Sequence, residues 1–177
     1  MTGMRASVGF TLVELMVAVA VVAILLISAM PAFGDLIDKY RLKGAADALH
    51  GEVQFARSEA IRRNQAVYMT FGTGANACFA IGTTTDCDCA SCDVRTRTSA
   101  QFAADFPNIL ISTVSAGNAA VGGFGLQPRQ GTSDAAADVA ITLTSARSAR
   151  QLRVVVGLLG LPRVCTPGGS LAGYATC

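Results

Sequence analysis

Cysteine is the residue type in this sequence with the widest chemical potential. The chain of 177 residues has six cysteines, and these are Cys78, Cys87, Cys89, Cys92, Cys165 and Cys177. Three of them fall in the run Cys87-Asp-Cys89-Ala-Ser-Cys92, a spacing that suits either a metal–thiolate site or disulfides. The segment 83–95 contains no histidine, and an even cysteine count is typical of proteins exported to an oxidising compartment. We therefore predict disulfides and no metal site.

Other side chains offer little for catalysis. His50 is the only histidine, and no nucleophile stands at a spacing that would pair it with a base. Asp86, Asp88 and Asp93 raise the alternative of a calcium loop, but they lack the glycine and closing glutamate of an EF-hand. The simpler interpretation is a solvated loop between disulfides. We expect no catalytic residue, no cofactor and no enzyme activity.

Basic residues gather near the C-terminus. Residues 139–177 contain no acid, and their arginines are Arg147, Arg150, Arg153 and Arg163. Such a patch would bind phosphates in a salt-dependent way; the alternative is an ordinary solvated strand face. The chain as a whole is nearly balanced, because removing Arg5 from the 14 basic residues leaves 13 after Gly9, against 12 acids. DNA binding is therefore a hypothesis about this patch alone.

These groups belong to a chain with one long apolar segment. The hydrophobic content of 51% and the mean hydropathy of +0.46 are high, and the excess lies in residues 15–34, which carry no charge. As a helix with a rise of about 1.5 Å per residue, this segment is about 30 Å long, the hydrocarbon thickness of a bilayer. We predict a single membrane span here.

The residues before this span indicate its orientation, and one charged residue, Glu14, stands at its start. Residues 1–9 are too short and polar for an ordinary signal peptide. Arg5 is the only charged side chain in residues 1–9, which favours a cytoplasmic N-terminus and an exported remainder. Glu14 stands at the start of the apolar run, where a carboxylate costs roughly 3 kcal/mol in a bilayer and normally has a partner or a function.

The run Gly9-Phe10-Thr11-Leu12-Val13-Glu14 before an apolar helix resembles the processing signature of type IV pilins and type II secretion pseudopilins. The resemblance implies cleavage by prepilin peptidase after Gly9 and N-methylation of Phe10. It also implies that Glu14 neutralises the new N-terminus of an adjacent subunit during assembly; the alternative is a carboxylate at the headgroup interface. Pro31 is expected to loosen the helix, as in similar pilins or in any membrane helix.

The helical pattern continues beyond the span. Its apolar positions alternate in steps of four and three residues: Leu42, Ala46, Leu49, Val53, Ala56 and Ala60. This stripe is one face of an amphipathic helix, on which a sheet packs; a coiled-coil partner is the alternative. We expect a leader at 1–9, the span at 10–34, the amphipathic half at 35–65 and an exported β-rich globular domain at 66–177.

After residue 66 the apolar period shortens to two, as in strands with one buried face. The predicted strands are 67–71, 78–81, 109–114, 139–144 and 152–156. Breaks are expected at the glycine- and asparagine-containing segments 72–76, 117–118 and 122–125. The predicted fold class is α+β, with a long N-terminal helix packed on a small antiparallel β-sandwich-like domain.

Two further segments are similar to the GspH/FimT family of minor pilins and pseudopilins: the helix end at 55–63 and the closing strands between 124 and 165. In some members the closing loop reads Gly-Arg-x-Arg and is implicated in binding DNA. Here the loop reads Gly160-Leu161-Pro162-Arg163, so the first arginine is absent. Related pilins often tie down the C-terminus with a disulfide, and Cys165 with Cys177 is the preferred pair. Cys78 would then join one of the clustered cysteines, leaving two for a local bridge.

The resemblance implies a minor pilin subunit of a type IV pilus. Before assembly it would be held in the inner membrane with a periplasmic C-terminal domain, and afterwards it would lie in the fibre at the cell surface. Its partners would be other pilins, prepilin peptidase and the inner membrane. The alternatives are a DNA-binding minor pilin for natural transformation, a minor pseudopilin of type II secretion, and a single-pass membrane protein in which Gly9 is never cut.

Overall fold

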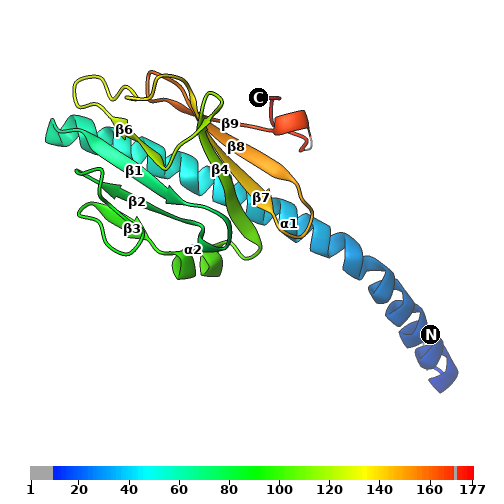
Figure 1. The fold of residues 1–177 in the computed structure, drawn as a ribbon. Coiled ribbons are helices and arrows are strands. Elements are labelled where there is room, and N and C mark those ends of the chain that lie inside the picture. Colours follow the sequence, from blue (N-terminus) through cyan, green and yellow to red (C-terminus); the bar gives the residue numbers. More distant parts are fainter. Residues whose placement is uncertain (1–9, 170) are drawn as a thin grey trace, which may run out of the picture. The chain divides into compact units, whose positions relative to one another are not determined.

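The computed structural model describes residues 10–169 and 171–177, without the side chains of residues 28–32. The chain forms two compact units, one up to Ile37 and the other from Asp38 to Cys177. Figure 1 shows the elements. In chain order they are α1 (Leu12–Arg63), β1 (Val67–Gly72), η1 (Gly74–Asn76), β2 (Cys78–Gly82), β3 (Arg95–Arg97), α2 (Ser99–Asp105), β4 (Ile109–Ala116), β5 (Ala119–Ala120), β6 (Gly123–Leu126), β7 (Val139–Ser145), β8 (Gln151–Val156), β9 (Pro162–Cys165) and η2 (Pro167–Gly169).

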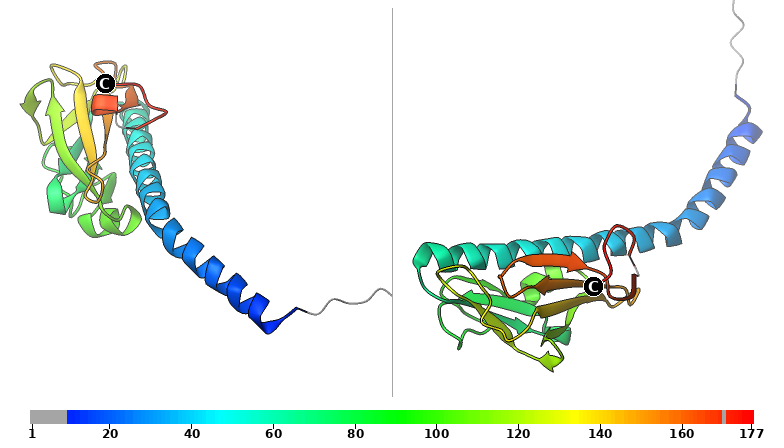
Figure 2. Two further views of the ribbon diagram at one scale, coloured as in Figure 1. Left: turned by 90° about the vertical axis from the view of Figure 1, so that its right-hand side faces the viewer. Right: turned by 90° about the horizontal axis from the view of Figure 1, so that it is seen from above.

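Two antiparallel sheets make up the β part of the second unit. The first has the strand order β3-β2-β1-β6 and the second the order β5-β4-β7-β8-β9. Both lie along the part of α1 that belongs to this unit (Figure 2). The predicted α+β class is thus confirmed, and so are the existence and type of the predicted strands.

The core lies between this part of α1 and the sheets. All the stripe residues from Leu42 to Ala60 are at most 1% exposed. They form one cluster with the alternate residues of β7 and β8, among them Ile141, Leu143 and Val154. The predicted stripe therefore packs on sheets of its own chain. Its alanines allow the strands to approach the helix closely.

One predicted break is wrong, because the segment 122–125 contains most of β6. Gly123 stands opposite Thr70 of β1, and Gly125 stands opposite Tyr68. A Cβ at Gly123 would collide with the carbonyl of Met69. Glycine here permits close strand approach in place of ending a strand.

The short helix α2 was also not predicted, although its sequence carries a start signal. Thr98 accepts a hydrogen bond from the Gln101 backbone N–H at 3.3 Å, and the Gln101 side chain accepts one from Thr98 N–H at 3.0 Å. This Thr-x-x-Gln pair is a capping box. The helix buries Phe102, which explains its position against the core.

Polar groups also join α1 to the strands within the second unit. The buried carboxylate of Asp38 accepts hydrogen bonds from the hydroxyls of Ser145, at 2.8 Å, and Ser148. His50 Nε2 donates to the backbone oxygen of Pro162 in β9 at 3.2 Å.

Near the end of α1, the Glu59 carboxylate accepts hydrogen bonds from Arg62 and Arg63. The side-chain hydrogen bond from Arg62 is the main reason that the pKa of Glu59 lies below its usual range.

Candidate functional site

The start of α1 presents the predicted assembly residue, Glu14. Thr11 precedes the helix, and its hydroxyl accepts a hydrogen bond from the Glu14 backbone N–H at 3.3 Å. The helix start is therefore capped by Thr11, a role that the sequence analysis missed. The side chain of Glu14 is exposed, and it is the only charged side chain from Phe10 to Gly34.

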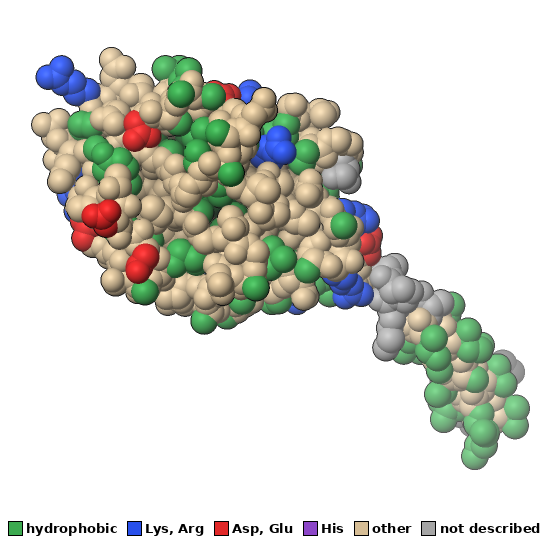
Figure 3. Space-filling model, in the orientation of Figure 1, with side chains coloured by type: hydrophobic (Ala, Val, Ile, Leu, Met, Phe, Trp, Pro, Cys, Tyr) green, Lys and Arg blue, Asp and Glu red, His purple; other side chains and the backbone are tan. Residues whose placement is uncertain are grey.

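Around Glu14 the helix surface is apolar. Figure 3 shows hydrophobic side chains predominating on the visible part of this segment, whereas acids, bases and polar groups are scattered over the globular unit. From Phe10 to Ile27, every large apolar side chain is at least 50% exposed. A surface that is apolar apart from Thr11 and Glu14 requires a partner or an apolar medium.

Gly9 and the side chain of Pro31 lie outside the described residues. Within the part of the chain that the structure describes, no helix is long and apolar enough to cross a membrane.

The cysteines form three disulfides: Cys78–Cys89, Cys87–Cys92 and Cys165–Cys177. The last is the pair that the sequence analysis preferred. Sulfur atoms of Cys87 and Cys92 and a carboxylate oxygen of Asp93 lie within 4.8 Å of one another. Because the two sulfurs are bonded to each other, neither is a thiolate that could bind a metal.

The aspartates of this loop accept internal hydrogen bonds. Asp88 accepts from the backbone N–H groups of Ala90 and Ser91, and Asp93 accepts from the backbone and hydroxyl of Thr83. Backbone hydrogen bonding is the main cause that lowers the pKa of both Asp88 and Asp93. The acids therefore organise the loop. Asp86 lies beside them in the same exposed region.

The arginines proposed for phosphate binding fall into two places. Arg153 of β8 donates to the Thr142 hydroxyl at 3.2 Å, and Arg163 of β9 pairs with Asp138 at 3.4 Å. Their strand register puts both on the outer face of the second sheet. Arg147 and Arg150 lie in the β7–β8 turn, before β8 begins. The structure thus brings two of the four together.

The loop around Leu161, the position of the absent arginine, is apolar, and its backbone packs closely against Gly131. Leu158, Leu159 and Leu161 are at least half exposed. Gly160 has a φ of +69°, and a Cβ there would collide with the Gly131 carbonyl oxygen, which itself accepts a hydrogen bond from Arg57. A glycine is therefore required at Gly160 for both backbone conformation and space.

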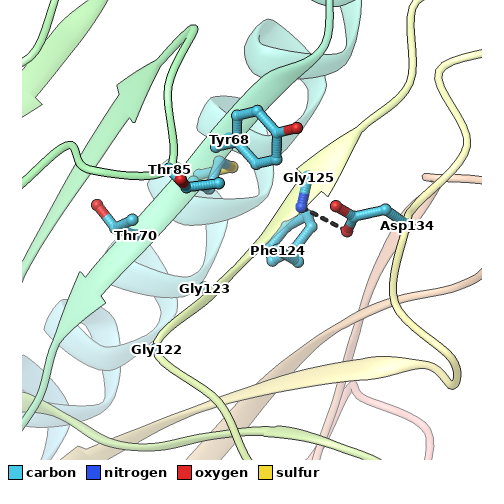
Figure 4. Close-up of a pocket in the computed structure, with 9 residues that line it drawn as sticks. Tyr68, Thr70, Thr85, Gly122, Gly123, Phe124, Gly125 and Asp134 are labelled. Atoms are coloured by element: carbon cyan, nitrogen blue, oxygen red, sulfur yellow. Dashed lines mark hydrogen bonds between the residues drawn. The ribbon is translucent and has the colours of Figure 1, made fainter.

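A hollow of about 450 Å³ on the first sheet had no sequence signal. Figure 4 shows the ring of Tyr68 from β1 near Gly125 of β6, with Asp134 hydrogen-bonded to Gly125. Thr70 of β1 and Gly123 of β6 also line the hollow. These residues come from segments far apart in the sequence, and their proximity depends on the β1–β6 pairing, which the sequence analysis did not predict.

Comparison with known proteins identifies the class. Two crystal forms of the type IV minor pilin FimU from Pseudomonas aeruginosa strain PAO1 resemble this chain, at 16% and 17% sequence identity. The TM-scores are 0.53 and 0.51; the matches cover 78% and 77% of this chain, and 97% and 100% of the FimU chains. A likeness at this identity defines the fold, which is that of a type IV pilin. No curated protein matches the sequence.

Family models give the closer assignment. Residues 45–160 match the model described as type II transport protein GspH, and residues 4–30 match the prokaryotic N-terminal methylation motif. Since the first match covers more than half of the chain, the protein belongs to the GspH family, a group of pilin-type structural subunits and not of enzymes.

Proposed function

We propose that this protein is a minor pilin whose apolar helix, freed by cleavage after Gly9, packs into the core of a type IV pilus. The observation that carries the proposal is the uncovered apolar surface from Phe10 to Ile27 with Glu14 as its only charge. Before assembly the same surface would be held in the inner membrane, with the globular unit in the periplasm.

Glu14 couples processing to assembly in this proposal. Within the described residues its carboxylate has no cationic partner, and cleavage after Gly9 would create an α-amino group at Phe10. The N-methylation motif matched at residues 4–30 supports this cleavage. In a neighbouring subunit such a group would pair with Glu14 inside an apolar core, where an unpaired carboxylate is costly.

Two measurements test this. Mass spectrometry of the membrane-extracted chain should find N-methylated Phe10 as the first residue, and any other mature N-terminus would contradict the proposal. Glu14→Val should be inserted and cleaved normally but should be missing from sheared fibres. Asp47→Asn, which removes an exposed charge from the globular half of α1, serves as the control and should be incorporated at wild-type level.

A type II secretion filament is the alternative assembly. The name of the family model supports it, while the structural likeness to a minor pilin supports the pilus. Deleting the gene separates the two: loss of pilus fibres with normal release of folded exoproteins is expected for the minor pilin, and the reverse for a pseudopilin.

DNA binding is a second candidate function, favoured by the outer face that Arg153 and Arg163 share. Phosphate contacts there would weaken as salt rises. The full-length protein in detergent should retard DNA at low salt, and the double variant Arg153→Ala with Arg163→Ala should not. Arg129→Ala, an exposed arginine elsewhere, is the matched control. Equal retardation by all three proteins would remove this candidate.

A further inference from the structure

The hollow on the first sheet is a separate feature, with no part in the proposed assembly function. Its volume of about 450 Å³ lies in the range of small-ligand sites. It is lined by Tyr68, Met69, Thr70, Thr85, Gly122, Gly123, Phe124, Gly125 and Asp134. All of these belong to the second unit.

Glycines create the space. In β6, Gly123 and Gly125 stand opposite the outward side chains of Thr70 and Tyr68, so this side of the strand has no side chains of its own. A Cβ added at Gly122 would meet no atom within 4 Å. The hollow is therefore open above Gly122 and walled by β1 side chains.

Asp134 is held in one orientation at the edge of the hollow. Its Oδ1 accepts a hydrogen bond from Gly125 N–H at 2.6 Å, and its own N–H donates to the Gly125 oxygen at 3.0 Å. Its other oxygen, Oδ2, does not take part in these hydrogen bonds. A Cβ added at Gly125 would collide with Oδ2, so this oxygen lies over Gly125 on the open side of the sheet. Among the described residues, Asp134 has no salt-bridge partner.

The ring of Tyr68 lies beside this free oxygen. The same Cβ on Gly125 that would collide with Asp134 Oδ2 would also collide with Tyr68 Cε1, and Figure 4 shows ring and carboxylate on either side of that glycine. Thr70 donates to the Cys87 carbonyl at 3.0 Å, which fixes the neighbouring wall. Lysine, arginine and histidine do not occur among the lining residues.

We propose that this hollow binds the guanidinium of an arginine side chain from a partner polypeptide. A carboxylate held in place, without a salt-bridge partner among the described residues and in a hollow lined by no basic side chain, is complementary to a positive charge. An aromatic ring next to it favours a planar guanidinium, which stacks on the ring while donating to the carboxylate. Asp134 is exposed, as are Gly122 and Thr85, so an incoming side chain has access from outside.

The test uses the full-length protein in detergent, labelled with 3-fluorotyrosine. The chain has three tyrosines, so ¹⁹F NMR gives three resonances, and Tyr68→Phe identifies the one of Tyr68. The probe is Nα-acetyl-arginine amide. Its neutral isostere, Nα-acetyl-citrulline amide, is the matched control. We expect the arginine probe to shift the Tyr68 resonance saturably, with a millimolar dissociation constant, and citrulline to leave it in place.

Three variants locate the binding. Asp134→Asn keeps the acceptor for Gly125 but removes the charge, and it should weaken binding about tenfold. Asp138→Asn makes the same change outside the hollow and should have no effect. Gly122→Leu fills the hollow and should abolish the shift; because nothing lies within 4 Å of its Cβ, the fold should persist, as judged by unchanged Tyr40 and Tyr174 resonances.

Several results would overturn the proposal. These are an unmoved Tyr68 resonance, an equal shift with citrulline, or unchanged binding in Asp134→Asn. Binding of free arginine without binding of the capped probe would point to a small metabolite in place of a polypeptide. A shift with methyl glucopyranoside but not with arginine would assign the hollow to a neutral sugar.

Discussion

Between Phe10 and Ile27, large apolar side chains of α1 are at least 50% exposed, whereas from Leu42 to Ala60 the apolar stripe is at most 1% exposed. The two segments belong to one helix but differ in where their apolar groups lie. The later segment confines them to one face, which the sheets of the same chain cover. The earlier segment is apolar all round, so its partner must come from outside the chain.

The largest expected effect comes from placing a charge in each segment. Val53→Asp buries an unpaired carboxylate in the core and should destabilise the globular unit by about 4 kcal/mol or more. Near-UV circular dichroism during heating measures this. Val22→Asp is the matched control: it should leave the melting temperature of the globular unit unchanged but block fibre incorporation. A normal melting temperature for Val53→Asp would show that the stripe is not a core.

The next effect concerns the C-terminus. Replacing both Cys165 and Cys177 by serine opens a loop with a sequence separation of 12 residues, and it should cost the globular unit about 3 kcal/mol. Under oxidising conditions the variant should have a lower melting temperature than the wild type. Its melting temperature should equal that of wild-type protein in which only this disulfide has been reduced. No loss of stability would mean that the end of the chain contributes nothing to the fold.

A smaller loss of stability is expected when Asp38, the first residue of the globular unit, loses a hydrogen-bond donor. Ser145→Ala removes a hydroxyl that donates to both oxygens of the buried Asp38, and it should cost about 2 kcal/mol in the free energy of unfolding. Urea unfolding measures it. Ser58→Ala changes an exposed serine of α1, the helix that carries Asp38. Its free energy of unfolding should equal that of the wild type within error. Equal values for the two variants would show that this carboxylate does not need its partner.

The smallest effect is the pH dependence due to Glu59. Its pKa is lowered from the ordinary 4.5, chiefly by the hydrogen bond from Arg62, so the folded state favours the carboxylate. The resulting stability is fully present above pH 4.5 and is lost as the pH falls through the lowered value. The melting temperature of the wild type should therefore fall more steeply below pH 4.5 than that of Glu59→Gln. Parallel curves would contradict this.

Sequence was sufficient where structure depends on local periodicity. The stripe on α1 and the alternation in β7 and β8 are visible because one face of each is buried. It was insufficient for β6, whose glycines are explained only by the pairing with β1, which brings the Met69 carbonyl against Gly123 and the Tyr68 ring against Gly125. The same pairing forms the hollow, so that site was missed for the same reason. Glu14 could be singled out as a candidate because a carboxylate is unusual within an apolar helix; its assembly role stays a prediction.

The bond between His50 and the Pro162 oxygen has a consequence for solubility. β9 is the last strand of its sheet, and edge strands expose backbone groups that can recruit a foreign strand and start aggregation. Pro162 has no N–H to offer, and the imidazole already occupies its oxygen. The start of β9 is therefore a poor template for another chain, which lowers the risk of aggregation through this edge.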